Sequence, residues 1–362
     1  MKIYYIDINR EKRNTAGAKA PDDIAKLCQE NGYERIEVSA FPAKKSRIYQ
    51  VIWLLFICTF EWKNISKNID SDSIIIYQHP SYGKRIAEKM IPKIQRKKNC
   101  KFIAVIHDLE SLRGGIKGVI EKNSKTNEIG DNILLKHFDI IICHNMNMKQ
   151  YLVTQGFKEE KIITLEIFDY LCDIDRIQPS KSKVPSIAIA GNLAVGKCQY
   201  IYEILDSEQS HNNSLIVNLF GINYNNLSNN KNLKYHGSFK PEELAKYLIG
   251  DFGLVWDGKS AKSCIGNTGE YLKYNNPHKT SLYLSSNMPV IVWKQAAIAD
   301  FILSNKVGIA VDNLYDLQNI INSISEEDYK KMCNNASRIG HNLRKGFYFN
   351  KAINMAIDIL NS

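Results

Sequence analysis

The stretch 271–292 combines a predicted helix start with side chains that could bind an anion. Asn276 can cap a helix and Pro277 can occupy its first position, which places His278 and Lys279 in the first turn. The start of a helix presents backbone N–H groups and partial positive charge, and both favour phosphate. A lysine at that place indicates a phosphate site, and a surface helix with a chance lysine is the alternative.

Three further loops of similar character each follow an apolar segment, at Gly191–Lys197, Phe220–Asn223 and Trp256–Gly258. Ligands of open parallel sheets bind beyond the carboxyl ends of the strands, where glycine lets the backbone approach a ligand. The first loop matches neither a Walker A loop nor a dinucleotide-binding fingerprint. Each loop alone is compatible with an ordinary turn. Four such sites at one edge of a sheet are a stronger indication of a ligand site.

A second candidate site lies in the first half of the chain, where His107 and Asp108 end a buried strand. A carboxylate beside an imidazole can act as a general base, although Asp108 could equally be a satisfied loop residue. The loop 9–23, which contains Gly17 and Lys19, also follows a strand. Both loops are therefore expected to face a cleft between two domains.

No metal site is predicted. The pairs Asp70/Asp72 and Asp173/Asp175 have the Asp-x-Asp spacing, but the first precedes a strand and the second lies in a linker. The eight cysteines form no CxxC pair, so neither zinc nor a redox motif is indicated. Buried free thiols in a reducing cytoplasm are the expectation.

Strand and helix patterns alternate through both halves, which predicts an α/β fold with two doubly wound, Rossmann-like domains. A chain of 362 residues also exceeds the size at which single cores stop growing. The predicted organisation is a domain at 1–170, a linker at 171–184, a domain at 185–342 and a final helical segment at 343–362. Strands are predicted at 3–8, 36–39, 73–78, 101–107, 140–144 and 161–165, and then at 186–190, 215–220, 233–237, 252–256, 290–293 and 308–311.

The net charge of +10 is concentrated in the first half of the chain. Residues 1–150 carry 26 basic and 17 acidic side chains, with clusters at 44–47 and 96–98. An anionic partner is therefore indicated, either a membrane surface, a phosphorylated acceptor or nucleic acid, although a merely soluble basic face is the alternative. No recognisable nucleic-acid-binding module is present, which disfavours nucleic acid.

The most apolar run, Val51–Phe60, is far shorter than the roughly 20 residues that span a bilayer. A buried helix is predicted there, with a membrane-facing helix as the alternative. The first residues lead directly into a strand pattern, so no signal peptide is predicted and the expected location is the cytoplasm, peripheral on the inner face of the plasma membrane.

Several motifs together resemble the bacterial β-1,6-galactofuranosyltransferases of O-antigen assembly, and more distantly the glucosyltransferases that extend N-acetylglucosamine on serine-rich adhesins. The resemblance covers nearly the whole chain, with additional segments near 44–60 and 116–130. The motifs are His107-Asp108-Leu109 with Leu112–Gly115, Ile167–Leu171, Ala190–Leu193, Phe252–Gly258 and Asn275–Ser285, and the stretch Ala16–Ala20 near the start.

The resemblance implies a GT-B fold, in which two Rossmann-like domains face each other across a cleft and the last helix, 346–360, crosses back to the N-terminal domain. It also implies a UDP-sugar donor held by the C-terminal domain, an acceptor held by the N-terminal domain, and no metal or other cofactor. The implied donor diphosphate and sugar contacts come from Gly191, Asn192, Lys197, Asp257, Asn275, Asn276, His278 and Lys279, and those to uracil and ribose from Phe220, Gly221 and Ile222. Acceptor-side contacts are implied for Gly17, Lys19, Arg113 and Gly114, and catalysis for Asp108 as base with His107 beside it.

The predicted function is an inverting transfer of galactofuranose from UDP-galactofuranose to a lipid-linked oligosaccharide in surface polysaccharide (O-antigen or capsule) synthesis. A UDP-glucose or other hexopyranose transferase of the same fold is the first alternative, because no residue in the sequence fixes a furanose against a pyranose. A non-catalytic subunit that binds sugar nucleotides or glycans is the second. A homo-oligomer is possible on sequence grounds.

Overall fold

The computed structural model describes residues 1–9, 16–81, 83–113, 129–174, 181–206, 215–225 and 230–362. The chain divides into two compact units. Unit 1 comprises Met1–Lys12, Pro21–Leu165 and Phe349–Ser362, and unit 2 comprises Arg13–Ala20 and Glu166–Tyr348.

Unit 1 is built on a six-stranded parallel sheet of order β2-β1-β3-β4-β5-β6. All six residues of β3 are buried, as expected for a parallel strand that is covered on both faces. The strands, each predicted from the sequence to within a few residues, are β1 (Ile3–Asn9), β2 (Glu34–Ser39), β3 (Ile74–His79), β4 (Lys101–Ile106), β5 (Ile140–Cys143) and β6 (Ile162–Thr164).

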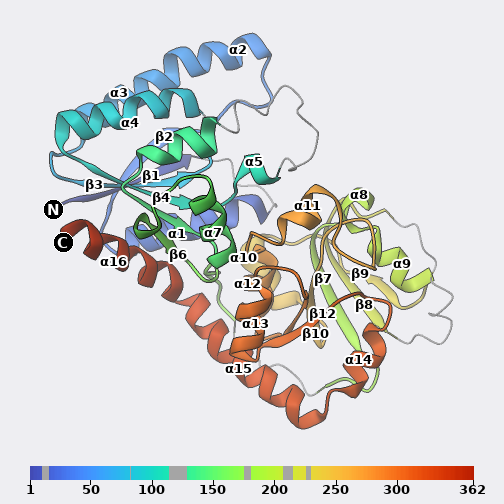
Figure 1. Cartoon of the computed structure of the whole chain (residues 1–362). Helices are drawn as coiled ribbons and strands as arrows, with labels where there is room; N and C mark the ends of the chain where they lie inside the picture. The colour runs from blue at the N-terminus through green and yellow to red at the C-terminus, as the bar shows by residue number, and fades with distance from the viewer. Residues whose placement is uncertain (10–15, 82, 114–128, 175–180, 207–214, 226–229) are drawn as a thin grey trace. The chain divides into compact units, whose positions relative to one another are not determined.

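Helices cover both faces of this sheet, with α3 and α4 on one side and α1 and α16 on the other (Figure 1). Asn31, just after α1, donates a hydrogen bond to Asn350 of α16 over 2.8 Å, which ties the end of the chain to its beginning. The helical elements are α1 (Lys19–Glu30), α2 (Arg47–Ile52), η2 (Trp53–Cys58), α3 (Thr59–Asn68), α4 (Lys84–Lys98), α5 (Glu110–Arg113), η3 (Ile129–Leu134), η4 (Leu135–His137), α7 (Met146–Thr154), η5 (Glu159–Lys161) and α16 (Phe347–Asn361).

The apolar helix predicted at 47–60 forms, but the prediction that it is buried is wrong for one of its faces. Trp53 and Cys58 are buried, whereas Ile48, Leu55 and Phe56 are each at least 60% exposed. A helix on the surface of a domain buries only one side against the core. When apolar residues occupy every side of the helix, those on the outer side remain exposed to solvent. No helix in the described ranges combines the length and the apolar character needed to cross a bilayer.

Unit 2 contains a second six-stranded parallel sheet, of order β12-β11-β10-β7-β8-β9. Its strands are β7 (Ser186–Asn192), β8 (Ile216–Ile222), β9 (Leu233–Tyr235), β10 (Phe252–Val255), β11 (Val290–Trp293) and β12 (Gly308–Val311). Its helical elements are η1 (Ala16–Ala18), α8 (Val195–Cys198), α9 (Tyr200–Asp206), α10 (Pro241–Tyr247), α11 (Gly266–Tyr271), α12 (His278–Ser285), α13 (Ala299–Asn305), α14 (Leu317–Ser323) and α15 (Glu326–Arg344). The predicted pair of doubly wound parallel sheets is therefore confirmed.

Helix α12 is held in place from both ends. Tyr283 lies against Gly253 of β10, and its hydroxyl accepts a hydrogen bond from the backbone N–H of Ala190 in β7 over 2.8 Å. At the C-terminal end, the guanidinium of Arg344 donates to the carbonyl of Ser285 over 2.6 Å. The helix starts at His278 with Pro277 as its N-cap residue, one residue later than the predicted Asn276 cap.

The thiols follow the sequence expectation. All eight cysteines are free, and six of them are buried, at 28, 58, 100, 143, 198 and 264. Burial raises the pKa of the Cys58 thiol to about 11, so this sulfur stays protonated at neutral pH. These residues therefore act as small core side chains.

Candidate functional site

A cluster of charged side chains lies at the carboxyl ends of β7 and β10 in unit 2. The ammonium of Lys279, at the start of α12, is 3.1 Å from Oδ1 of Asp257 and also donates to the carbonyl of Trp256 over 3.1 Å. Lys197 Nζ lies 3.8 Å from the same carboxylate oxygen. Cε of Lys279 lies 4.0 Å from the position that a Cβ on Gly191 would occupy, so Gly191 is next to this lysine. The structure thus brings together four residues that the sequence predicted for one site.

The electrostatics of this cluster favour an anionic ligand. Burial lowers the pKa of the Lys279 ammonium, but the Asp257 carboxylate outweighs burial and the net shift is upward, so Lys279 stays charged at neutral pH. Two lysines face one carboxylate, which leaves the cluster with an excess of positive charge. An ammonium has three donors, and two of those on Lys279 point to Trp256 and Asp257. A phosphate oxygen is a suitable acceptor for the third.

The ends of β7 and β8 approach each other through two glycines. Gly191 pairs with Gly221 in the sheet, and both have positive φ, +127° and +150°. A Cβ on Gly221 would lie only 2.8 Å from the carbonyl carbon of Gly191. One residue further on, Asn192 pairs with Ile222 in the sheet, and its side-chain oxygen accepts from Asn223 over 3.0 Å. The predicted glycines therefore permit a close backbone approach.

The aromatic residue predicted beside the uracil, Phe220, is fully buried and stacks on His236, with ring centroids 4.7 Å apart. The sequence did not single out a second aromatic pair at the same strand end. Tyr224 and Tyr235 stack with their centroids 4.5 Å apart, and the Tyr235 hydroxyl donates to the carbonyl of Gly221 over 2.8 Å. The sequence could have indicated this pair, because both tyrosines lie at or just after a strand end and a base can stack on such rings.

The polar residues before Lys279 contact the segment that follows β6. The amide of Asn276 donates to the carbonyl of Glu166 over 2.8 Å, and Nε2 of His278 lies 3.2 Å from the carbonyl of Asp169. Burial lowers the pKa of His278 to about 4, so the imidazole is neutral at pH 7. Asn275 differs, because its Oδ1 is buried and accepts no hydrogen bond within the described ranges.

The acceptor-side residues Gly17 and Lys19 belong to unit 2, although the sequence groups them with the first domain. Lys19 is buried, donates to the carbonyl of Leu171 over 2.6 Å and lies 4.7 Å above the ring of Tyr170. Gly17 is exposed, with open space where a Cβ would stand. This pair therefore belongs to a different compact unit from the His107 loop, which is in unit 1.

The predicted catalytic pair lies at the carboxyl end of β4 in unit 1. His107 Nε2 is 2.7 Å from Oε1 of Gln78, at the end of the neighbouring strand. Asp108 accepts a 2.7 Å hydrogen bond from the guanidinium of Arg113, so two predicted residues form an ion pair. This contact fixes the position of the carboxylate at the strand end. The predicted Gly114 lies outside the described residues.

A buried hydrogen-bonded pair beside this loop was missed from the sequence. His79 Nε2 lies 2.9 Å from Oδ1 of Asp131, whose other oxygen accepts from the backbone N–H of Ser111 over 2.6 Å. Burial raises the pKa of Asp131, but the hydrogen bonds from His79 and Ser111 outweigh it and the net shift is downward. The position of His79 at the end of β3, next to β4, could have indicated this site. Its partner Asp131 could not be inferred, because it lies 52 residues further along the chain.

Metal-ligating side chains do not gather elsewhere in the part of the chain that the structure covers. No group of three or more His, Cys, Asp or Glu side chains within those ranges could hold an ion. Asp70 pairs with Lys2 over 3.0 Å, and Asp72 accepts from Asn99 over 2.5 Å, so both belong to surface contacts. Asp175 lies outside the described residues.

Comparison with known proteins places this architecture among glycosyltransferases. Residues 2–167 match the N-terminal domain of the glucosyltransferase 3-like family, and residues 187–356 match its C-terminal domain. The chain is 32% identical to the β-1,6-galactofuranosyltransferase WbbI of Escherichia coli K12, over 99% of both chains.

Solved structures show the same fold at low sequence identity. Sucrose-phosphate synthase from Thermosynechococcus elongatus superposes with a TM-score of 0.66 at 10% identity, over 100% of this chain and 99% of that one. An α-glucosyltransferase in complex with UDP gives a TM-score of 0.58 at 13% identity, over 100% of both chains. These neighbours have the GT-B fold, which confirms the predicted fold class. The chain belongs to the glucosyltransferase 3-like family and is a glycosyltransferase.

Proposed function

We propose that the protein transfers galactofuranose, with inversion, from UDP-galactofuranose to a hydroxyl group of a lipid-linked oligosaccharide in surface polysaccharide synthesis. The observation that carries this proposal is the full-length identity of 32% to a β-1,6-galactofuranosyltransferase. The Lys279–Asp257–Lys197 cluster at the strand ends of unit 2 supports the donor half of the proposal.

The donor diphosphate binds at the start of α12 in this proposal. Lys279 and Lys197 neutralise the phosphate charge, and the glycines at 191 and 221 let the backbone approach it. As the sugar leaves, negative charge develops on the diphosphate, and fixed cations at that point stabilise the leaving group. This is the task that a divalent metal performs in other transferases, so the proposed reaction does not require one.

Asp108 is the proposed base. Galactofuranose is α-linked in its UDP donor, so a β product requires one direct displacement with inversion. In that step the acceptor hydroxyl loses its proton to Asp108, the new C–O bond forms, and the bond to the diphosphate breaks. Arg113, paired with Asp108 over 2.7 Å, positions the carboxylate before the step, and His107 is the preceding residue.

A hexopyranose donor is the main competing assignment, because the matching family is described as glucosyltransferase 3-like. A mass-spectrometric transfer assay with UDP-galactofuranose and UDP-glucose separates the two. The expected result is a mass gain of one hexose on an oligosaccharide acceptor with UDP-galactofuranose alone. Transfer from UDP-glucose alone would overturn the furanose assignment. UDP binding without hydrolysis or transfer from either donor would identify a non-catalytic subunit.

The donor role of Lys279 is tested by Lys279→Ala, with Lys294→Ala as a matched control. Lys294 is exposed and paired with Asp312 over 3.2 Å. Because a hydrogen bond to a charged group contributes about 1.5–3 kcal/mol, UDP affinity measured by calorimetry should fall by roughly 10- to 150-fold in Lys279→Ala only. Unchanged affinity would remove Lys279 from the diphosphate site.

The role of Asp108 is tested by Asp108→Asn, with Asp312→Asn as the control. Loss of a general base costs about 10²- to 10⁴-fold in turnover, while UDP affinity should stay the same. Full turnover by Asp108→Asn would refute the assignment. Separately, activity that disappears in EDTA and returns with manganese would contradict the proposed metal-free reaction.

We also propose that the enzyme works at the cytoplasmic face of the membrane, where a lipid-linked acceptor is presented. The excess of basic residues in the first 150 positions supports this location, because anionic lipid attracts clustered Lys and Arg.

A further inference from the structure

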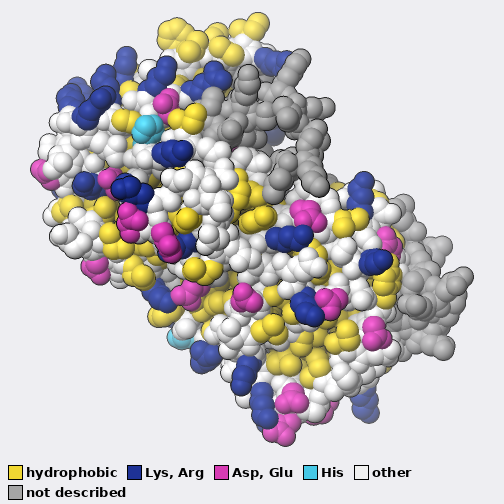
Figure 2. Space-filling model, in the orientation of Figure 1, with side chains coloured by type: hydrophobic (Ala, Val, Ile, Leu, Met, Phe, Trp, Pro, Cys, Tyr) yellow, Lys and Arg dark blue, Asp and Glu magenta, His cyan; other side chains and the backbone are white. Residues whose placement is uncertain are grey.

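A continuous apolar surface covers the outer side of the helical segment formed by α2, η2 and the start of α3 in unit 1. We call it the apolar face. Ile48, Ile52 and Phe56 are spaced by four residues, as expected for one side of a helix. Its members are between 38% and 74% exposed, and they are Ile48, Tyr49, Val51, Ile52, Leu55, Phe56, Ile57 and Phe60. Figure 2 shows hydrophobic side chains gathered over α2.

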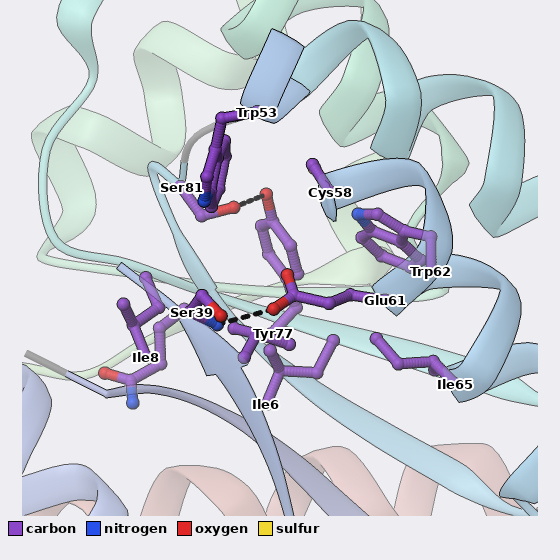
Figure 3. Close-up of a pocket in the computed structure, with 12 residues that line it drawn as sticks. Ile6, Ile8, Ser39, Trp53, Cys58, Glu61, Trp62, Ile65, Tyr77 and Ser81 are labelled. Atoms are coloured by element: carbon purple, nitrogen blue, oxygen red, sulfur yellow. Dashed lines mark hydrogen bonds between the residues drawn. The ribbon is translucent and has the colours of Figure 1, made fainter. Parts of the chain in front are cut away.

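The inner side of the same segment already supplies the contacts that the fold of unit 1 needs. Trp53, Trp62 and Ile65 are buried, and they line a pocket against β1 and β3 (Figure 3). Phe41 packs edge-on against Trp53 with ring centroids 5.6 Å apart, and Glu61 accepts from the backbone N–H of Ser39. Packing among the described residues of the unit therefore does not account for the apolar face. An exposed apolar patch of this kind marks an interaction surface.

Basic side chains lie at one end of the apolar face and on the neighbouring helix α4. Lys44, Lys45 and Arg47 are exposed directly before and at the start of α2. On α4, which packs on α3, an exposed basic stripe runs with a spacing of four residues. The stripe consists of Arg85, Lys89, Lys93 and Lys97. Basic side chains beside exposed aliphatic and aromatic ones are the composition of helices that lie in the interface of an anionic membrane.

We propose that the apolar face inserts into the headgroup region of an anionic lipid bilayer, with the segment 47–60 lying in the plane of the membrane. Charge complementarity decides the occupant. A second copy of this chain, docked through the same face on a two-fold axis, would bring more of the same positive charge to that face, which is unfavourable, whereas anionic headgroups attract it. The inference builds on the proposed membrane location but does not depend on the identity of donor or acceptor.

Vesicle flotation of the full-length protein tests the proposal. We expect flotation with vesicles of phosphatidylcholine and phosphatidylglycerol, and much less with phosphatidylcholine alone. The double variant Ile52→Ser/Phe56→Ser should lower the partition coefficient on anionic vesicles about 100-fold. Each substitution removes the favourable transfer of an apolar side chain from water into the bilayer, which we expect to weaken binding about tenfold. The matched control is Met146→Ser/Leu303→Ser, which removes two similarly exposed apolar side chains outside the face and should float like the wild type.

The charged part is tested by Lys44→Ser/Lys45→Ser. About fivefold weaker binding per removed charge predicts a loss of about 25-fold on anionic vesicles and little change on neutral ones. Far-UV circular dichroism and a thermal unfolding curve check that each variant is folded, because the substituted residues of the apolar face and Lys44 and Lys45 lie in unit 1 and the proposed UDP site lies in unit 2. If the double variant Ile52→Ser/Phe56→Ser does not fold, Ile48→Ser, at the most exposed position of the face, replaces it.

Three results would overturn the proposal. One is equal flotation of the wild type and Ile52→Ser/Phe56→Ser. Another is equal binding to anionic and neutral vesicles. The third is a wild-type dimer that does not float and that Ile52→Ser/Phe56→Ser converts to a monomer, which would make the apolar face a contact between copies. Protein that floats as expected but transfers no sugar would refute the proposed enzyme activity and leave the membrane surface standing.

Discussion

Gly253→Ala tests whether α12 positions the charged cluster. Gly253 lies in β10, directly under the ring of Tyr283. A Cβ at this position would be 2.1 Å from Cγ and 2.6 Å from Cδ1 of that ring, whereas ordinary contact begins at 3.4 Å. The ring would therefore have to move by 1.3 Å, the difference between 3.4 and 2.1 Å.

Tyr283 cannot move freely, because its ring is fully buried and its hydroxyl accepts a 2.8 Å hydrogen bond from the backbone N–H of Ala190. Overpacking a core costs about 1–3 kcal/mol, and a hydrogen bond that is lost adds about 1 kcal/mol. The expected loss of unfolding free energy in Gly253→Ala is therefore about 2–4 kcal/mol. Lys279 lies one turn before Tyr283, so a displacement of this size also moves the ammonium from Asp257 and should weaken UDP binding at least tenfold.

Urea unfolding and UDP calorimetry measure the two effects. Gly196→Ala is the control for the urea measurement alone, because its backbone has no positive φ and no atom lies within 4 Å of the added Cβ, although the residue precedes Lys197 of the proposed diphosphate site. It should be neutral or slightly stabilising. If Gly253→Ala unfolds at the same urea concentration as the wild type and binds UDP equally well, the packing of Tyr283 does not position α12.

Three further predictions concern buried polar groups. Asp251 accepts hydrogen bonds from the N–H and hydroxyl of Ser186 over 2.8 and 2.7 Å, so Asp251→Ala should cost about 2–4 kcal/mol in a urea titration, and a loss below 1 kcal/mol would contradict this. Asp131→Asn leaves His79 poorly paired in the core and should lower the unfolding free energy by about 3 kcal/mol; an unchanged melting curve would refute this. Burial lowers the pKa of His144 to about 4, below its unfolded value of about 6.5, so stability is lost as pH falls from 6.5 towards 4, by about 2 kcal/mol at pH 5. His144→Gln should flatten this dependence, and an unaltered slope would exclude His144 as its source.

Much of the fold could be predicted because parallel strands buried on both faces appear as unbroken apolar runs. Ile74–Ile76 and Val290–Val292 are fully buried in the structure for that reason. Helix faces are harder. The run at 51–60 has no polar stripe that would mark its outer side, so the sequence could not distinguish a buried helix from an exposed one.

The charged cluster was predictable, since its members follow strand ends of the same sheet and carboxyl ends of parallel strands share an edge. The pair His79–Asp131 was not, because its two residues are far apart in the sequence and neither belongs to a motif. The sequence also does not show which side chains are covered. Phe220, near the end of a strand, could be expected to stack on a ligand, but the His236 ring already stacks on it.

Helix α12 shows why the most specific motif in the chain does not reveal the donor sugar. Four polar side chains on and just before this helix face the backbone of residues 166–170. Asn276 donates to Glu166, His278 lies next to Asp169, and the hydroxyl groups of Ser281 and Ser285 donate to Phe168 and Tyr170 over 2.6 and 3.4 Å. These four contacts fix the helix against the preceding segment of its own unit. Lys279 differs from them, because its ammonium contacts the Asp257 carboxylate at the strand end. A motif whose polar groups mostly fix the helix leaves only Lys279 for the proposed diphosphate site and does not specify a furanose or a pyranose. The residues that select the ring are therefore better sought by substitution at Asn192, Tyr224 and Asn275 than within α12 itself.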